Sequence, residues 1–442
     1  DLLAPLLLSL LCAAPSVTAL EVTDALLHQW PQWRGPLANG VAPHANPPTR
    51  WSETENVKWK VRVPGHGTAS PIVWSNQVFL LTAVPTGEKS EPAPSDAPEG
   101  LRRMTAAADQ VQRFTVMAFD RDTGAVRWEH SPREQKPHAG HHRDHGYASA
   151  SAITDGELLI AHFGSHGTYA YDLGGRLLWE KDLGDMRTRA SFGEGSSPAL
   201  HGDFVVVLWD HEGDDFLVAL NKRTGQERWR QARDEPTGWS TPLVVTHAGK
   251  AQVVLNGTRK IRAYDLQTGQ PLWEGPGQTQ NPVPTPVAAD GIVYVTSGYR
   301  GSALQAFRLG RSGDLTGTDA ILWNHQRNTP YVPSPLLYDG LLYFFAVNTA
   351  KLTILEVPAG TPTVDGQEIE GLEGVYASPT GAANRVYLVG RDGGTVVLKK
   401  SPQLEVLARN RLDDGIDASP ALVDRQMFLR GRQNLYCLEE KR

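Results

Sequence analysis

Residues 240–274 read STPLVVTHAGKAQVVLNGTRKIRAYDLQTGQPLWE, and this stretch decides the fold. It contains four runs rich in β-branched and apolar residues, which begin near Pro242, Val253, Ile261 and Pro271. Short turns containing Gly, Asn, Asp or His-Ala-Gly separate the runs, as expected for antiparallel strands with tight connections. The stretch predicts one four-stranded β-sheet, and no helix is needed to explain it.

The same unit recurs along the chain. Each copy begins with small residues just before a position that is usually proline, and the eight positions are Pro71, Ala152, Pro198, Pro242, Pro286, Pro335, Pro379 and Pro420. Their successive spacings are 81, 46, 44, 44, 49, 44 and 41 residues. A repeat of about 40–50 residues that carries several strands is typical of a β-propeller. The sequence therefore predicts an all-β, eight-bladed propeller of four-stranded antiparallel blades.

The connection between the third and fourth strands recurs with its side chains in register. In the first blade it runs AFDRDTGAVRW over 118–128, with Asp120, Gly124 and Trp128 at positions that return in blades three and four. Asp can accept backbone N–H bonds within the turn, and Gly can adopt a positive φ. We expect the Trp of each outer strand to fill the space between two diverging blades.

The two ends of the repeat region are incomplete in complementary ways. Blade eight begins at Pro420 and ends near Cys437, which leaves no room for a fourth strand. Residues 56–63, which include Trp59, resemble an outer strand that lacks its own three inner strands. Pairing this N-terminal strand with the C-terminal blade would close the ring and leave no open edge. We expect Trp59 to pack as Trp128 does.

The first residues indicate export from the cytoplasm. Residues 2–14 form an apolar run that is shorter than a transmembrane helix requires. A pair of small residues separated by one position follows at 17–19, as at a signal-peptide cleavage site. This combination predicts a signal peptide over 1–19, truncated at its start, and an extracytoplasmic, periplasmic or secreted protein. Lipidation at Cys12 stays open, although the preceding leucines do not suit a lipoprotein processing site.

The rest of the chain divides into two parts. Residues 20–50 are expected to form an N-terminal extension, and 51–442 the propeller, with an insertion over 85–112 in blade one. The net charge is −6 and no long basic run occurs, which argues against nucleic acid as a partner. We expect no transmembrane span in the mature chain and a monomeric protein.

Several stretches resemble one family. They are AFDRDTGAVRW (118–128), WPQWRGPLANGVAP (30–43), SFGEGSSP (191–198), WSTP (239–242), VPTP (283–286), TSGY (296–299) and YVPSP (331–335). These motifs resemble the PQQ-like family of bacterial proteins with pyrroloquinoline-quinone-type propeller repeats, in a secreted branch. The resemblance covers nearly the whole mature chain and implies an eight-bladed propeller, a fold that hosts many activities.

The resemblance implies two different functions. Quinoprotein alcohol dehydrogenases of this family hold pyrroloquinoline quinone with calcium, an Asp base, a Trp floor and a disulfide between adjacent cysteines. The present sequence has no such cysteine pair, and we place no matching calcium ligands in it. The other function is that of the scaffold lipoprotein of the outer-membrane barrel assembly machine, which binds a partner protein and no cofactor.

One face of the propeller carries the candidate binding residues. The segments just before the innermost strands contribute His66, Tyr147, Trp239, Tyr331, Tyr376 and Asp417. The loops between second and third strands of blades four to eight contribute Arg259, Arg300, Lys351, Arg391 and Arg432. Basic and aromatic residues together favour polar, anionic or sugar-like ligands. The alternative is structural, with basic turn residues for solubility and aromatic side chains that plug the channel.

The segment PHAGHHRDHGY at 137–147 is the most metal-like part of the chain. His138, His141, His142 and His145 offer imidazole ligands for zinc or copper, although their spacing fits no established motif. An exposed histidine-rich loop without metal is the alternative.

These observations favour a noncatalytic binding or scaffold protein of the cell envelope or secreted space, without a cofactor. Its partner would be an envelope protein or a polar small molecule or glycan on this face. The alternatives are a quinone-dependent oxidoreductase that uses the channel mouth, and a carbohydrate-processing accessory protein.

Overall fold

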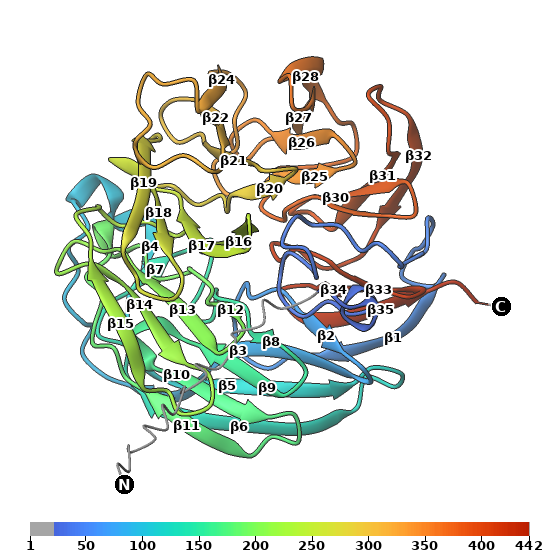
Figure 1. Ribbon diagram of the computed structural model, residues 1–442. Coiled ribbons are helices and arrows are strands. Elements are labelled where there is room, and N and C mark those ends of the chain that lie inside the picture. The colour runs from blue at the N-terminus through green and yellow to red at the C-terminus, as the bar shows by residue number, and fades with distance from the viewer. Residues whose placement is uncertain (1–21, 442) are drawn as a thin grey trace, which may run out of the picture.

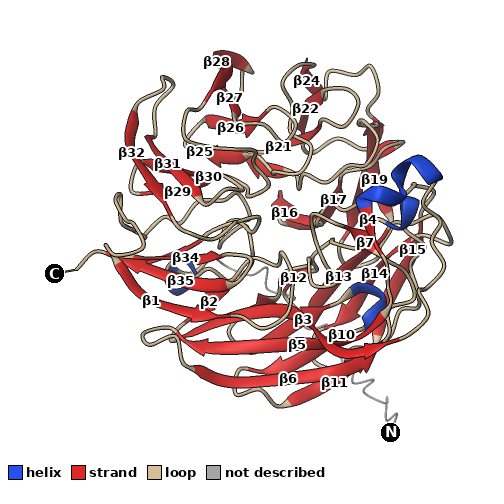
Figure 2. Cartoon of the chain, turned by 180° about the vertical axis from the view of Figure 1, so that it is seen from behind, coloured by secondary structure: helices blue, strands red, loops and turns tan. Residues whose placement is uncertain are grey.

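The computed structural model describes residues 22–441, so the predicted signal peptide and Cys12 lie outside the described residues. Helix is confined here to the short α1 (Asp24–Leu27) and three 3-10 turns, η1 (Glu99–Met104), η2 (Gly164–His166) and η3 (Arg189–Ser191). Strands make up nearly all other regular structure, as Figure 2 shows. No helix within 22–441 has the length and apolar character needed to cross a membrane.

Eight antiparallel sheets surround a central channel, which confirms the predicted eight-bladed propeller (Figure 1). Blade one contains β2 (Ile72–Trp74), β3 (Gln77–Lys89), β5 (Gln110–Asp120) and β6 (Val126–Gln135). Blade two contains β8 (Ile153–Thr154), β9 (Leu158–His162), β10 (Thr168–Asp172) and β11 (Leu177–Lys181). Blade three contains β12 (Ala199–His201), β13 (Phe204–Trp209), β14 (Phe216–Asn221) and β15 (Glu227–Ala232).

In these three blades the strands follow one another in sequence order from the innermost to the outermost, and the next four blades have the same order. Blade four contains β16 (Leu243–His247), β17 (Lys250–Leu255), β18 (Lys260–Asp265) and β19 (Pro271–Pro276). Blade five contains β20 (Val287–Ala289), β21 (Ile292–Ser297), β22 (Ala303–Arg308) and β24 (Ile321–His325). Blade six contains β25 (Leu336–Tyr338), β26 (Leu341–Phe345), β27 (Lys351–Glu356) and β28 (Thr361–Glu368). Blade seven contains β29 (Thr380–Ala382), β30 (Arg385–Val389), β31 (Gly394–Lys399) and β32 (Val406–Arg411).

Blade eight is built from both ends of the described chain. It contains β33 (Ala421–Val423), β34 (Gln426–Arg430) and β35 (Asn434–Glu439), and its outer strand is β1 (Val57–Arg62). Trp59 lies opposite Cys437, and Arg62 lies opposite Asn434. The predicted closure of the ring is confirmed, and the pairing removes the open edge that blade eight would otherwise present.

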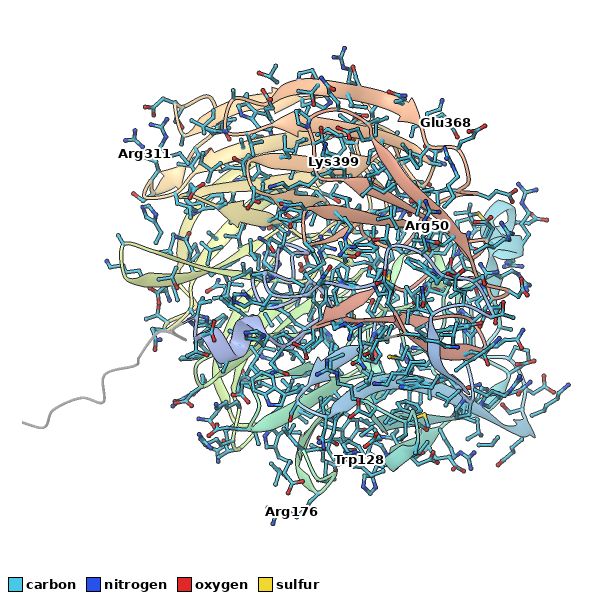
Figure 3. All side chains as sticks on the ribbon, turned by 90° about the vertical axis from the view of Figure 1, so that its right-hand side faces the viewer. Arg50, Trp128, Arg176, Arg311, Glu368 and Lys399 are labelled. Atoms are coloured by element: carbon cyan, nitrogen blue, oxygen red, sulfur yellow. The ribbon has the colours of Figure 1, made fainter. Side chains whose placement is uncertain are left out.

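Tryptophans of the outer strands join each blade to the next. The Trp59 indole packs on Gly124 of blade one, where an added Cβ would lie 2.8 Å from the ring. Its Nε1 donates to the Arg121 carbonyl at 2.9 Å, and Trp128 Nε1 donates to the Leu173 carbonyl at 3.2 Å in the same way. Trp59 therefore packs as Trp128 does. Charged side chains such as Arg176 and Arg311 lie at the outer rim (Figure 3).

A closed circle of hydrogen bonds surrounds the channel. In each blade, the residue just before the proline position donates its backbone N–H to the side-chain hydroxyl of the equivalent residue in the next blade, at 2.9–3.2 Å. We call these eight residues the hydroxyl ring: Ser70, Ser151, Ser197, Thr241, Thr285, Ser334, Ser378 and Ser419. All eight are buried. A small hydroxyl side chain is required here because it must fit near the crowded axis and still accept a hydrogen bond.

Two regions depart from the simple repeat. The long connection in blade five contributes β23 (Gly313–Asp314), which pairs in parallel with β19 and adds a fifth strand to the sheet of blade four. Residues 85–112 lengthen β3 and β5 at their ends, and Pro85 still pairs with Gln112. Beyond these ends, β4 (Thr105–Ala106) pairs with β7 (His141–His142) of the histidine-rich segment.

The N-terminal extension crosses the face of the propeller where first and second strands turn. Trp30 forms a bridge to Val73 of blade one, and Val41 forms a bridge to Gly381 of blade seven. The fully buried Arg34 donates to the Pro379 carbonyl at 3.0 Å and to the Pro335 carbonyl at 2.6 Å. No carboxylate of the described part of the chain pairs with this guanidinium, and burial lowers the pKa of Arg34 to about 9. The extension is thus anchored next to the channel axis.

Candidate functional site

The channel holds a cavity of about 210 Å³, which we call the channel cavity. Its aromatic lining is Trp33, Phe192, Trp239, Tyr331 and Tyr376. Its polar lining includes His142, Asp144, His145, Asp417 and five members of the hydroxyl ring. Trp33 comes from the N-terminal extension, whereas the other four aromatic residues belong to the opposite face, where the innermost strands begin. The cavity thus combines flat apolar rings with hydroxyls and carboxylates.

Contacts with neighbouring blades hold the side chains of Trp239 and Tyr331 in place. The Trp239 N–H donates to the Pro282 carbonyl at 2.9 Å, and its Nε1 donates to the Gly193 carbonyl at 2.8 Å. Tyr331 stacks on Tyr299 with ring centroids 4.7 Å apart. These contacts fix the aromatic walls before any ligand arrives, which lowers the entropy cost of binding.

An ion-pair network spans the mouth of the channel. Arg391 contacts Asp417 at 2.6 Å and Asp144 at 3.2 Å, and its guanidinium lies 3.8 Å from the Tyr376 ring centre. The Tyr376 hydroxyl donates to Asp144 at 2.9 Å, and Arg432 contacts Asp417 at 3.1 Å. The histidine-rich segment of blade two is thereby tied to blades seven and eight.

Burial and the partners of Asp144 act on its pKa in opposite directions. Burial raises the pKa of Asp144. The Tyr376 hydrogen bond and the Arg391 charge together lower it by more than burial raises it, so the pKa lies below its usual value. The same contact with the carboxylate, added to burial, raises the pKa of Tyr376. At neutral pH, Asp144 is therefore an ionised acceptor and Tyr376 a neutral donor.

The four histidines predicted as possible metal ligands lie near the mouth of the channel, but their ring nitrogens contact different partners. His138 Nε2 lies 2.8 Å from the Met186 carbonyl, and His145 Nε2 lies 2.5 Å from that of Phe192. His141 Nδ1 lies 2.8 Å from the His142 carbonyl, and His142 Nδ1 accepts from the Asp144 N–H. Across 22–441, these four histidines do not bring three ligand atoms within 4.8 Å of one another.

Desolvation keeps most of these imidazoles neutral. Burial lowers the pKa of His141 and of His142, and it lowers the pKa of His145 to about 4. Each ring nitrogen can then serve as either a donor or an acceptor, depending on the tautomer.

The predicted face residues fall into three groups. Trp239, Tyr331, Tyr376 and Asp417 line the channel cavity, and Arg391 and Arg432 border it through their ion pairs. His66 and Tyr147 do not line the cavity: they pack near His141, with their rings 6.5 Å and 4.6 Å from its ring, and burial lowers the pKa of His66. Arg259 and Arg300 are exposed and do not line the cavity.

The row of basic residues does not form a continuous cationic surface. Arg391 and Arg432 are paired with two carboxylates, those of Asp144 and Asp417, so their charge is already compensated. Arg259 bonds the Asp234 carbonyl, and Arg300 lies over the Tyr299 ring. The geometry therefore favours a ligand without a large negative charge.

Three contributors to the cavity were not identified from the sequence. Trp33 lies in the motif at 30–43, which shows no repeat position, and the hydroxyl ring corresponds to the small residues before each proline position. Asp144 lies in the histidine-rich segment, where the histidines are the predicted ligands. The small hydroxyl residue before every proline position was the one available signal for the ring.

The cavity does not suit pyrroloquinoline quinone with Ca²⁺. This quinone carries three carboxylates, yet no Lys or Arg side chain of the described residues lines the cavity. The carboxylates of Asp144 and Asp417 are ion-paired to arginines, and no three His, Cys or acidic ligand atoms gather in this part of the described chain. Ca²⁺ is held largely by carboxylate and carbonyl oxygens, and both carboxylates of this lining are already engaged by arginines.

Solved structures resemble this fold at low sequence identity. BamB from Moraxella catarrhalis is 14% identical, with a TM-score of 0.52 over 81% of this chain and 99% of that protein. A europium-containing methanol dehydrogenase is 10% identical, with a TM-score of 0.61 over 93% and 98%. Quinohemoprotein alcohol dehydrogenase from Comamonas testosteroni is 11% identical, with a TM-score of 0.60 over 94% and 81%. These likenesses show the fold alone.

Sequence comparison assigns the family. A search of curated proteins found no significant match. The family model of PQQ-type repeats described as outer membrane protein assembly factor BamB matches residues 49–213, 114–361 and 213–442. These overlapping matches cover all eight blades. The chain therefore belongs to the PQQ-like repeat propeller family that this model describes.

Proposed function

We propose that this protein is a noncatalytic binding propeller that recognises its ligand at the channel cavity. The observation that carries the proposal is the composition of the cavity, where aromatic rings from four blades and the extension surround hydroxyls and compensated carboxylates. Small-molecule binding sites are typically lined by apolar and aromatic side chains, with a few polar groups that orient the ligand, and the channel cavity has this composition.

The cavity's chemistry narrows the ligand class. Trp239, Tyr331 and Tyr376 offer flat faces against which the C–H face of a sugar ring can pack. The buried indole N–H of Trp33 has no hydrogen-bond partner among residues 22–441 and can donate to a ligand. With its charges compensated, the site favours a neutral, hydroxyl-rich group, as in a glycan.

The size of the cavity supports a small recognised group. Its volume of about 210 Å³ is below the range of roughly 300–1,000 Å³ for drug-sized ligands. The cavity would take one sugar-sized ring, while the rest of a longer glycan lies on the surrounding face. A scaffold role toward an envelope protein would use the same face.

The proposed location is outside the cytoplasm, and the chain is proposed to act as a monomer. The apolar run and small-x-small pattern of residues 1–19 support export. The name of the matched family model, outer membrane protein assembly factor, agrees with a role in the cell envelope.

The test is binding of a panel of neutral and acidic oligosaccharides to the purified chain, followed by tryptophan fluorescence and calorimetry. Pyrroloquinoline quinone with Ca²⁺ is titrated in parallel. We expect saturable binding of a neutral oligosaccharide, and Trp239→Ala should weaken it by at least tenfold. Arg300→Ala is the matched control, because Arg300 lies on the same face outside the cavity.

Two results would contradict the proposal. Stoichiometric quinone binding that requires Ca²⁺ would favour the oxidoreductase. Oligosaccharide binding that Arg300→Ala abolishes and Trp239→Ala leaves intact would move the site from the cavity to the basic rim.

A further inference from the structure

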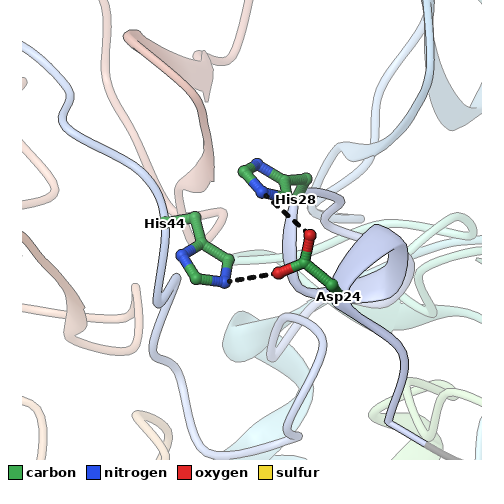
Figure 4. Close-up of side chains that lie close together, drawn as sticks. All are labelled: Asp24, His28 and His44. Atoms are coloured by element: carbon green, nitrogen blue, oxygen red, sulfur yellow. Dashed lines mark ion pairs between the residues drawn. The ribbon is translucent and has the colours of Figure 1, made fainter.

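A second cluster of ligand-type side chains lies far from the channel mouth, on the N-terminal extension. Asp24 is the first residue of α1, and His28 follows the helix at position i+4, so both side chains share one face. His44 comes from a later part of the extension and lies beside them, with its ring stacked on that of His28 at 4.5 Å between centroids (Figure 4). Within 22–441, this is the only group of three such residues whose ligand atoms lie within 4.8 Å of one another.

The distances match those of a shared metal ion. Asp24 Oδ2 lies 3.8 Å from His28 Nε2, and Asp24 Oδ1 lies 3.4 Å from His44 Nε2. Two ligands of a tetrahedral zinc ion, each about 2.0–2.1 Å from it, are roughly 3.3 Å apart. A single ion between the three groups requires the two stacked imidazoles to turn their Nε2 atoms toward it, which their partly exposed positions permit.

A second carboxylate, that of Asp424, lies near the other nitrogen of the His28 ring. The other ring nitrogen of His28, Nδ1, lies 3.7 Å from Asp424 Oδ1, in the turn between β33 and β34 of blade eight. Asp424 is itself held by Arg121 at 2.7 Å, and its carbonyl accepts from the Asn46 N–H. This distance is too long for a hydrogen bond, but a small turn of the His28 ring would place Asp424 where a carboxylate usually supports a metal-bound imidazole, fixing its orientation and raising the basicity of the ligating nitrogen.

We propose that Asp24, His28 and His44 form a binding site for a divalent transition metal, with Zn²⁺ as the expected occupant. Two imidazoles and one carboxylate are a common zinc ligand set, and water can fill the fourth position. The ion would join two parts of the extension and, through Asp424, link them to blade eight. The three side chains are 84%, 44% and 39% exposed, so the metal would exchange readily with solvent and chelators.

The alternative is a metal-free cluster of histidine–aspartate ion pairs. The experiment strips the purified chain with a chelator and then measures Zn²⁺ uptake by calorimetry and by metal analysis of the desalted protein. We expect one equivalent in the wild type, and its loss in both His28→Ala and His44→Ala. Asp424→Asn should retain the equivalent with about tenfold to hundredfold weaker affinity.

Two control variants address other histidines. His247→Ala changes a histidine in blade four, and His142→Ala tests the histidine-rich segment. Both should keep the equivalent. Uptake in His28→Ala and His44→Ala equal to the wild type would overturn the proposal, as would loss of the ion in either control. The apo variants should unfold at the wild-type temperature because the altered side chains are partly exposed, so a folding defect is separable from lost binding.

Discussion

Replacing Ser378 by alanine tests whether the hydroxyl ring stabilises the propeller. Ser378 is 2% exposed, and its hydroxyl accepts the backbone N–H of Ser334 at 2.9 Å. Neither residue lines the channel cavity, so water in the cavity does not reach the N–H that the substitution leaves unpaired. An unsatisfied buried donor costs about 1–3 kcal/mol, and we expect the free energy of unfolding to fall by that amount.

Two further variants make the prediction specific. Ser378→Thr keeps the hydroxyl and should recover most of the loss, since the ring naturally holds threonine at Thr241 and Thr285. Ser151→Ala removes the acceptor of the Ser70 N–H next to the channel cavity, where a water molecule can replace it. We therefore expect Ser151→Ala to cost less than Ser378→Ala.

The assay is equilibrium urea unfolding followed by tryptophan fluorescence. A lower midpoint with an unchanged slope would show that stability alone has changed. The reasoning is refuted if Ser378→Ala unfolds within about 0.5 kcal/mol of the wild type, below the usual net value of one hydrogen bond. It is also refuted if Ser378→Thr is as unstable as Ser378→Ala, because the hydroxyl would then not be the acceptor that matters.

Five other substitutions, together with a pH series and a thiol-reactivity assay, test the remaining features. Trp59→Ala should cost about 3–5 kcal/mol in urea unfolding, and Trp128→Ala should cost less because Trp128 is only half-buried; a smaller loss for Trp59→Ala than for Trp128→Ala would contradict its role in closing the ring. Gly124→Ala should lower the unfolding temperature, because its φ is +74° and its Cβ would lie 2.8 Å from the Trp59 ring. His145 has a pKa lowered to about 4 by burial, so the unfolded chain takes up a proton at higher pH than the folded one. Stability should therefore fall as the pH drops from about 6.5 towards 4, by ~2 kcal/mol at pH 5 from this group, and His145→Asn should flatten the dependence of the unfolding temperature on pH. Burial raises the pKa of Cys437, so its thiol should react with Ellman's reagent only after denaturation, with Cys437→Ser as the control; rapid reaction in the native protein would contradict its burial.

Much of the fold was predictable because the repeat is local and periodic. The turn that begins at Asp120 and the tryptophan at Trp128 recur within a few residues of each other, so each copy shows the same spacing. Closure of the ring was also predictable, because the strand that contains Trp59 had no inner strands of its own and blade eight had no outer strand. The pairing of β1 with β35 confirms this prediction.

The site was less predictable because its contacts are neither local nor periodic. Asp144 meets Tyr376 and Arg391 across the channel, more than 200 positions away in the sequence. Trp33 reaches the cavity from an aperiodic extension, so no repeat position indicates where it lies. The repeat correctly gave the loop positions of Arg259 and Arg300, but not that their side chains remain outside the cavity.

The pairing of β1 with β35 also has a consequence for how the chain folds. Val57 lies opposite Leu438, so blade eight can form only after the chain between these two residues is available. Contacts so distant in sequence form slowly, because a very long loop must close before they contribute any stability. Until then the nascent chain exposes unpaired strand edges, which favour aggregation. We therefore expect completion of blade eight to be the slow step of refolding and the stage at which a chaperone helps most.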